Sequence, residues 1–307
     1  RDHVAKCGYH GWQDWSICTK SGRNAGVPEI IKTMTHEFVY NDPNSLEEIF
    51  KQYPNQIAAV ILEPAASEKP MNDFLIKVAE FTRRHGAILV FDEMVTGFRW
   101  ALGGAQEYFG VTPDLVCFGK AISNGYPIAV LSGKSEYMKR MDEVFVSMTL
   151  GGSTLGLVAA IETIGMMQEF GDVHKYMHEL GDYLIAGGNR IATQYELPIK
   201  FVGYGPHPIV TCDIKDDYLA RVLKTFIYQE FHEAGIFFST SMMIGYMHTK
   251  AHIDGVLKLL ELIAKKVQKI VGPVRTVGTV TSGKDYKKLE AKLYGEVMAP
   301  RTVRAQQ

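Results

Sequence analysis

Two stretches of the sequence decide the fold: GAILVFDE at residues 86–93 and PDLVCFGK at residues 113–120. Each contains a short, continuous apolar run, which is the pattern of a strand buried on both faces. The first run is followed by Asp92, and the second leads through a glycine to Lys120. Two residues of opposite charge therefore stand where two predicted strands stop.

The flanking segments extend this pattern into an alternation of strands and helices. Ile57–Leu62 is another apolar run, and Glu63 follows it. The next segment, Asp73–Arg84, has apolar side chains at helical spacing. This alternation predicts an α/β fold with a mostly parallel sheet flanked by helices, in which ligands bind beyond the carboxyl ends of the strands. Glu63, Asp92 and Lys120 all stand at such ends.

The second half of the chain is predicted to be helical at first and then mixed. Leu155–Ala186 has a helical pattern, and from about residue 196 short strands and helices indicate a smaller α+β domain. We expect a large domain with its connecting helix over 1–185, the small C-terminal domain over 186–272, and a linker or frayed end over 273–307. The remaining predicted strands are Ile128–Leu131, Phe201–Gly205, Pro208–Cys212 and Gly235–Ser239, and the remaining predicted helices are Leu219–Ala234 and Ile253–Val271.

The composition excludes several classes of function. The 33 basic and 34 acidic residues give a net charge of -1, so we expect no nucleic acid and no membrane as partners. The four cysteines lack a metal-ligand spacing, which favours reduced thiols and a cytoplasmic location. No apolar run approaches the roughly 18 residues of a membrane span. The chain starts without a methionine or a signal peptide, so we expect the large domain to be incomplete at its N-terminus.

The pair of Asp92 and Lys120 has a specific chemical interpretation. Pyridoxal 5'-phosphate (PLP) chemistry needs a lysine that forms a Schiff base and a carboxylate that keeps the pyridine nitrogen protonated. The glycine-rich surroundings of Lys120 suggest a crowded crevice, in which a desolvated amine becomes a nucleophile and a base. A lysine after a strand is more often a solvated surface residue, and Asp92 could simply form a turn. A Walker-type phosphate site is excluded, because the sequence lacks the required glycine-rich loop.

Two further motifs are weaker signals. Tyr9, His10 and Gly11 precede a pair of tryptophans, and they could form a platform on which a ring stacks. Aromatic residues of this kind are more often part of a core. The segment Thr149–Ser153 stands directly before a predicted helix, where hydroxyl and N–H groups can bind phosphate. An ordinary helix cap is an equally good interpretation.

Taken together, these segments resemble the class-III aminotransferases, which have the fold-type-I architecture of PLP-dependent transferases. The matching segments are YHGW, AAVILEP, FDEMVTGFR, PDLVCFGKAISNGYPIAVLSG and MTLGGS, in the same order over roughly residues 1–270. FDE and GK together form the most specific block. The subgroup that the chain resembles most is that of glutamate-1-semialdehyde 2,1-aminomutase, on the evidence of GVP, YND, TGFR and ALGGAQ.

The resemblance implies a role for each matched residue. Lys120 would be the Schiff-base lysine and the base of a 1,3-proton shift, and Asp92 would pair with the pyridinium nitrogen. Thr149 would reach the cofactor phosphate of a neighbouring subunit, so two active sites would form across a homodimer interface. The cofactor-binding residues would be Tyr9 stacking on the ring, His10 and Gly11 beside it, Glu63 near the ring hydroxyl, Asp92, Val95, Lys120 and Thr149.

The sequence departs from the family pattern in three places. The N-terminal stretch of the family, with its phosphate-binding loop, has no counterpart in this chain. Ile244 stands where the aminomutase subgroup has an acidic gating residue, and residues 237–243 contain no arginine for a substrate carboxylate. The resemblance therefore favours an aminotransferase that acts on a small-molecule amino donor and carbonyl acceptor. An aminomutase, with a lyase or epimerase behind it, and a catalytically inactive module of a larger protein stay open as alternatives.

Overall fold

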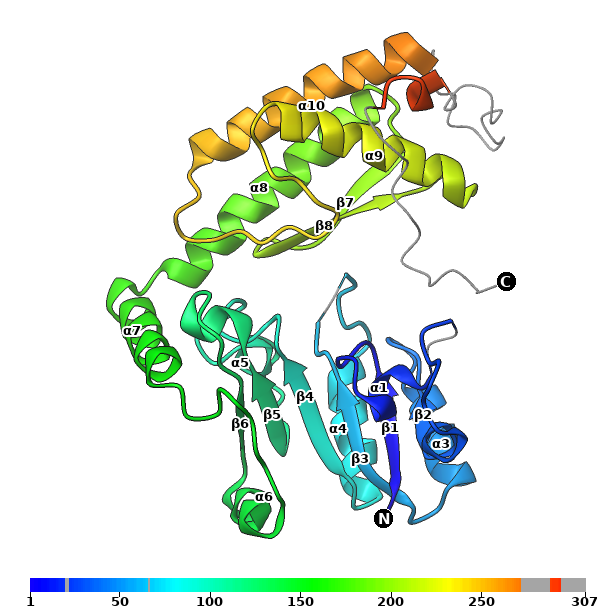
Figure 1. Ribbon diagram of the computed structural model, residues 1–307, viewed down its shortest axis with the longest axis vertical. Coiled ribbons are helices and arrows are strands. Elements are labelled where there is room, and N and C mark those ends of the chain that lie inside the picture. The colour runs from blue at the N-terminus through cyan, green and yellow to red at the C-terminus, as the bar shows by residue number, and fades with distance from the viewer. Residues whose placement is uncertain (20–21, 66, 272–287, 294–307) are drawn as a thin grey trace. The chain divides into compact units, whose positions relative to one another are not determined.

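The computed structural model describes residues 1–19, 22–65, 67–271 and 288–293. The chain forms two compact units, of which the first covers Arg1–His174 and the second starts at Lys175. The first unit contains a six-stranded sheet in the order β2-β1-β3-β4-β5-β6 (Figure 1). All neighbouring strands from β2 to β5 are parallel, and β6 runs antiparallel to β5. The strands are β1 His3–Cys7, β2 Thr35–Glu37, β3 Ile57–Leu62, β4 Ile88–Glu93, β5 Leu115–Phe118 and β6 Val130–Gly133.

Helices flank this sheet, as the alternating pattern predicts. The apolar faces of α3 and α4 pack with the strands in one core that includes Leu46, Phe50, Phe74, Val78 and Phe91. α4 ends before Gly86, whose left-handed backbone (φ 61°) turns the chain into β4. The helices of this unit are α1 Asp14–Ile17, α2 Glu29–Thr33, α3 Pro43–Gln52, α4 Phe74–Arg84, α5 Ala105–Phe109, the 3-10 helix η1 Lys120–Ser123, α6 Ser135–Met138, the 3-10 helix η2 Lys139–Glu143 and α7 Thr154–Phe170.

A buried carboxylate fixes the turn that follows β4. Glu93 is wholly buried, and it accepts hydrogen bonds from the N–H groups of Ala105 (2.5 Å) and Gln106 (2.9 Å) and from the Thr96 hydroxyl (2.8 Å). Burial raises the pKa of the Glu93 carboxyl, and these donors act in the opposite direction. Glu93 thus ties the start of α5 to the end of β4, and it holds the backbone beside Asp92 in place.

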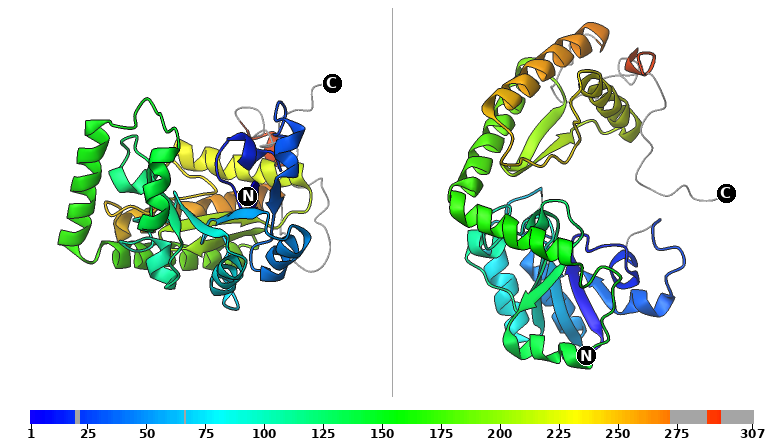
Figure 2. Two further views of the ribbon diagram at one scale, coloured as in Figure 1. Left: turned by 90° about the horizontal axis from the view of Figure 1, so that it is seen from below. Right: turned by 60° about the vertical axis from the view of Figure 1, so that its left-hand side comes forward.

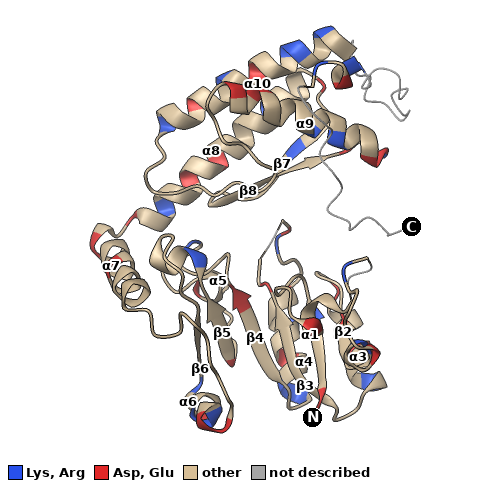
Figure 3. Cartoon of the chain, in the orientation of Figure 1, with Lys and Arg blue, Asp and Glu red and all other residues tan. Residues whose placement is uncertain are grey.

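The second unit is a small α+β arrangement. Its elements are α8 Val173–Gln194, which begins at the end of the first unit, β7 Ile199–Tyr204, β8 His207–Cys212, α9 Asp217–Glu233 and α10 Lys250–Val271 (Figure 2). β7 and β8 form an antiparallel pair. Gly187 and Gly188 of α8 lie so close to Leu257 of α10 and Phe201 of β7 that a Cβ atom at either position would clash. Both signs of charge occur along α8 and α10 (Figure 3).

The fold confirms the predicted α/β class and corrects several boundaries. β4 runs on to Glu93, so Asp92 lies within the strand, and β6 begins two residues later than the predicted strand at Ile128. The predicted strand Gly235–Ser239 was wrong. The chain meets β8 beyond this segment, at an isolated bridge between Ser241 and Ile209, where Thr240 accepts the Val210 N–H (2.8 Å) and Met242 donates to the Pro208 carbonyl (3.0 Å). A regular ladder is prevented because Pro208 on β8 has no N–H to donate.

The units divide at His174 and Lys175 rather than near residue 185. The physical reason is that the contacts of α8 change within its first turn: His174 Nε2 lies 3.2 Å from the Phe98 carbonyl oxygen of the first unit, whereas the Tyr176 hydroxyl donates to the His248 carbonyl of the second (2.7 Å). Most of the predicted tail over 273–307 lies outside the described residues. Residues 288–293 include a helical turn, and Leu289 within it is fully buried, so this part of the predicted linker is packed.

Candidate active site

The carboxyl ends of four parallel strands bring the candidate residues to one edge of the sheet. The loop Gly8–Gly11 follows β1, Glu63 follows β3, Asp92 lies at the end of β4, and Lys120 begins η1 after β5. Because β1, β3, β4 and β5 are adjacent in the sheet, these residues form a row. The crevice beyond such an edge is where ligands bind in open α/β sheets.

The closest contact in this row joins His10 to Asp92. His10 Nδ1 lies 2.8 Å from Asp92 Oδ2, and His10 Nε2 lies 3.1 Å from the Cys7 carbonyl oxygen. A carbonyl can only accept, so Nε2 carries a proton, and a second proton must lie between Nδ1 and the carboxylate oxygen. The two side chains are 2% and 12% exposed. His10 and Asp92 are therefore a charge-assisted pair that shares a proton away from bulk water.

The Asp92 carboxylate is fixed from a second direction. Its Oδ1 accepts the Met94 N–H (3.1 Å), which is the turn-forming contact expected of an aspartate after a strand. The structure thus shows the turn contact that the sequence predicts for Asp92, and its role toward a pyridine nitrogen stays a prediction. Each carboxylate oxygen has two lone pairs, so Asp92 retains capacity to accept a further donor from the crevice.

Glu63 lies beside this pair and has a perturbed titration. Burial raises the pKa of its carboxyl, and the Asp92 carboxylate raises it further, whereas His10, the Tyr9 N–H and Lys120 act in the opposite direction. Glu63 Oε1 accepts the Tyr9 N–H at 3.3 Å. Gly8 allows this approach, since its φ of 103° favours glycine and a Cβ there would come within 3.2 Å of Glu63 Oε1. Glu63 can thus hold a proton at a higher pH than an ordinary glutamate.

Lys120 is exposed rather than enclosed. It opens η1 with a left-handed backbone (φ 48°), a conformation that is uncommon for a residue with a side chain. The glycine-rich sequence around Lys120 suggests a crowded crevice that removes water from the amine. The described residues of the first unit do not form such an enclosure around it. Lys120 is close enough to affect the pKa of Glu63, which places its charge on the same side of the sheet as the His10–Asp92 pair.

The other predicted residues differ in how they relate to this cluster. Tyr9 is 53% exposed and Gly11 has a φ of 98°, both in the loop that carries His10. Val95 is half-buried in the turn after β4. Thr149 is exposed in the turn before α7, and the structure gives it no bond to the cluster. Sequence reasoning missed Ser16, whose hydroxyl accepts the His10 N–H (3.2 Å), and the Cys7 carbonyl, because neither carries a motif.

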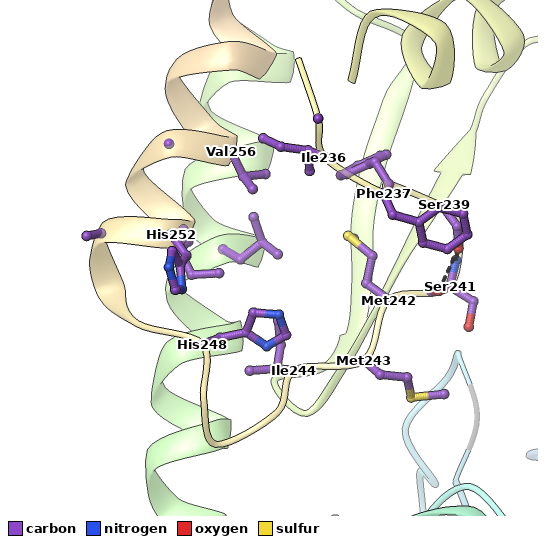
Figure 4. Close-up of a pocket in the computed structure, with 16 residues that line it drawn as sticks. Ile236, Phe237, Ser239, Ser241, Met242, Met243, Ile244, His248, His252 and Val256 are labelled. Carbon is purple, nitrogen blue, oxygen red and sulfur yellow. Dashed lines mark hydrogen bonds between the residues drawn. The ribbon is translucent and has the colours of Figure 1, made fainter. Parts of the chain in front are cut away.

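The second unit contains an apolar groove of about 830 Å³ between α10 and the segment after α9. Figure 4 shows Ile236, Met242 and Ile244 lining it together with His248 and His252. Each histidine accepts a backbone N–H at Nδ1, so in its neutral form it presents an Nε2–H donor. The groove lining includes no carboxylate and no guanidinium, and Ile244 is 4% exposed.

The described residues contain neither a metal-binding cluster nor a membrane-spanning helix. Within residues 1–19, 22–65, 67–271 and 288–293, no cluster of three or more His, Cys, Asp or Glu side chains could hold a metal ion. Over the same ranges, no helix is both long and apolar enough to cross a membrane.

Comparisons with known proteins agree with this geometry. Residues 6–278 match the family described as aminotransferase class-III. The 3-aminobutyryl-CoA aminotransferase of Cloacimonas acidaminovorans is 33% identical over 87% of this chain and 66% of its own length. A glutamate-1-semialdehyde 2,1-aminomutase of Staphylococcus epidermidis is also 33% identical, over 86% and 66%. The chain thus spans just under two thirds of the length of these curated relatives.

Solved structures show the same architecture. The FumI protein of Sphingopyxis, determined as its PLP internal aldimine form, matches 90% of this chain and 67% of its own with a TM-score of 0.80 and 25% identity. An omega-transaminase from Sphaerobacter thermophilus matches with a TM-score of 0.78 at 22% identity, which shows the likeness of fold. The chain belongs to the class-III aminotransferase family.

The raised pKa of Glu63 predicts a pH-dependent effect of its replacement. Between the unfolded pKa of 4.5 and the higher folded pKa, the folded state holds more protons than the unfolded state. The contribution of Glu63 to the free energy of unfolding of the wild type therefore falls as the pH rises through that window. The free energy of unfolding of Glu63→Gln relative to wild type should rise from about pH 4.5 upward and then level off, as measured by urea unfolding.

The exposed Glu68, in the same loop, gives the matched control. Glu68→Gln makes the same change in net charge, so subtracting its effect isolates the contribution of burial at Glu63. If the difference in free energy of unfolding between Glu63→Gln and wild type stays constant between pH 4.5 and neutral pH, the Glu63 carboxyl does not have a raised pKa.

Proposed function

We propose that this member of the class-III aminotransferase family is a PLP-dependent aminotransferase, which moves an amino group between a small-molecule amino donor and a carbonyl acceptor. The observation that carries the proposal is the His10–Asp92 pair at the strand edge that also presents Lys120. The family match and the relatives that are aminotransferases support it.

The residues present fit the cofactor. Asp92 is a carboxylate oriented from two sides that still has lone pairs toward the crevice, as a partner for a pyridinium nitrogen must. Lys120 offers an exposed amine, and Tyr9 offers an exposed aromatic ring. Tyr9, His10, Gly11, Glu63, Asp92, Val95 and Lys120 would hold the cofactor within one chain. When bound, PLP supplies a carbonyl that reacts reversibly with amines and a ring that accepts the electron pair from the amine-bearing carbon.

Each residue then has a task that its contacts support. Asp92 would hold a proton at the pyridine nitrogen, and His10 orients the Asp92 carboxylate. Lys120 would hold the cofactor through Nζ and, when released, would carry the proton of the 1,3-shift from the amine-bearing carbon of the substrate to the carbonyl-derived carbon of the cofactor. Glu63, with its raised pKa, holds or donates a proton near the ring hydroxyl.

An aminomutase is the alternative within the same chemistry. The aminomutase relative favours it, because its sequence is 33% identical to this chain, as is that of the aminotransferase relative. Against it stands Ile244, a buried aliphatic side chain that can supply no acidic group at that position. A mutase needs no external keto acid, whereas an aminotransferase stalls without one, so product analysis separates the two.

The surface around α7 supports a second copy of this chain as partner. Large apolar side chains are exposed there: Phe145 is 94% exposed, Leu155 69%, Val158 50% and Ile161 68%. An exposed apolar surface of this kind is typical of an interface. Thr149 lies in the same segment, which is consistent with a role toward a neighbouring subunit. We propose a homodimer in which this surface is buried.

The Schiff-base role of Lys120 predicts one site of covalent trapping. The chain is incubated with PLP, reduced with borohydride, digested and analysed by mass spectrometry. The cofactor should be found on the peptide that contains Lys120, and Lys120→Ala should lose it. Lys134→Ala removes another exposed lysine of the same unit and should retain the adduct. Trapping on other lysines alone, with Lys120 unmodified, would rule out the proposed role.

The interface proposal predicts that a charge on α7 weakens association. Ile161→Glu would bury a carboxylate in the interface, so it should shift the chain from dimer to monomer in light scattering after gel filtration. Leu262→Glu makes the same change at a 54% exposed position on α10 and should leave the dimer intact. Equal masses for wild type and Ile161→Glu would count against α7 as the interface.

A further inference from the structure

Lys6 is a fully buried lysine that stands outside the candidate active site. It is the last residue but one of β1 and is 0% exposed. Its neighbours Ala5 and Cys7 both belong to the apolar core with α3 and α4. Because side chains alternate along a strand, the Lys6 stem is directed to the other face of the sheet from theirs. A buried ammonium is costly unless it is paired and hydrogen-bonded, so its partners indicate what it does.

The partners of Lys6 connect the two ends of one loop. Lys6 Nζ lies 3.1 Å from Glu37 Oε1, its cross-strand neighbour on β2, and it donates a long hydrogen bond to the Gly8 carbonyl (3.4 Å). The same Glu37 oxygen accepts the Thr19 hydroxyl at 2.6 Å. Gly8 begins the loop that carries Tyr9 and His10, and Thr19 lies just after the short helix α1 that follows it.

The loop after β1 carries His10 past the end of β3 to the end of β4. His10 leaves the end of β1 and reaches Asp92 on β4, with β3 lying between them in the sheet. The imidazole is held by the Cys7 carbonyl, one residue beyond Lys6. A shift of the Gly8 carbonyl would therefore move the start of the loop and lengthen the contact between His10 and Asp92.

We propose that Lys6 and Glu37 are positioning residues, which clamp the segment Gly8–Thr19 so that His10 stays on Asp92. Lys6 is buried whereas the Glu37 side chain is 37% exposed, so the pair is only partly shielded from water. An ion pair of this kind adds little net stability compared with apolar side chains, which leaves the geometry that it imposes as its proposed role. The link to catalysis rests on the proposed function, whereas the clamp itself can be tested in the chain without cofactor.

The test follows the His10 side-chain nitrogens by NMR in the full chain without PLP. His10→Gln identifies the His10 signals. In wild type the two nitrogens should give the signals of an imidazole that is hydrogen-bonded on both sides, because both face acceptors. Lys6→Met should shift these signals toward those of a solvent-exposed histidine. Lys134→Met, which breaks the exposed pair with Asp114 (2.5 Å), should leave them in place. With PLP added, Lys6→Met should bind the cofactor more weakly than wild type, because the loop that carries His10 is no longer held at Gly8.

The paired variant Lys6→Met/Glu37→Met separates positioning from stability. It replaces the ion pair with apolar side chains of similar volume, so it should unfold at a urea midpoint close to that of wild type. The His10 signals should still be displaced as in Lys6→Met, which a merely stabilising role would not produce. Folded variants in which the His10 signals match wild type would overturn the proposal. That readout does not depend on PLP, so a failure of the proposed function would appear separately as absent PLP binding.

Discussion

The contact between His10 and Asp92 is the constraint on which the rest of the site depends. It joins a loop after β1 to the end of β4, and thereby spans β3 at the edge where Glu63 also emerges. The Cys7 carbonyl accepts from the second imidazole nitrogen, so both ring nitrogens of His10 face acceptors. An aspartate held in this way has a fixed orientation, which is what a partner for a protonated ring nitrogen requires. The parallel order of the strands is what brings these parts together.

Buried charge recurs around this contact, and each instance is held by identifiable donors or acceptors. Glu93 binds two backbone N–H groups and a hydroxyl, and Lys6 binds Glu37 and the Gly8 carbonyl. Glu63 receives one backbone N–H, and its pKa is raised by burial. These hydrogen bonds tie the backbone around the strand ends to particular side chains. The polar contacts at this edge of the sheet therefore orient the side chains of the candidate site.

The sequence predicted the sheet and the row of Glu63, Asp92 and Lys120, because a charge after an apolar run is visible without a structure. It did not reveal β1, since Lys6 interrupts HVAKC and hides the strand pattern, although burial of a lysine is possible once Glu37 pairs with it in register. The bond of His10 to Asp92 was equally invisible, because 82 residues separate the two and only the strand order makes them neighbours. The predicted strand Gly235–Ser239 was wrong, because the chain meets β8 later, at the isolated bridge between Ser241 and Ile209, and Pro208 beside that bridge has no N–H to extend it into a ladder. The roles of the predicted site residues stay predictions that the geometry supports.

The protonation state of the cofactor nitrogen tests the central claim most directly. The chain would be loaded with PLP labelled with ¹⁵N in the pyridine ring, and the nitrogen chemical shift compared between wild type and Asp92→Asn. Asparagine at this position keeps the size of the side chain but loses the charge that holds the proton. The account predicts a protonated ring nitrogen in wild type and an unprotonated one in the variant near neutral pH. The same shift in both proteins would contradict the assignment of Asp92, and with it the interpretation of the strand edge as the active site.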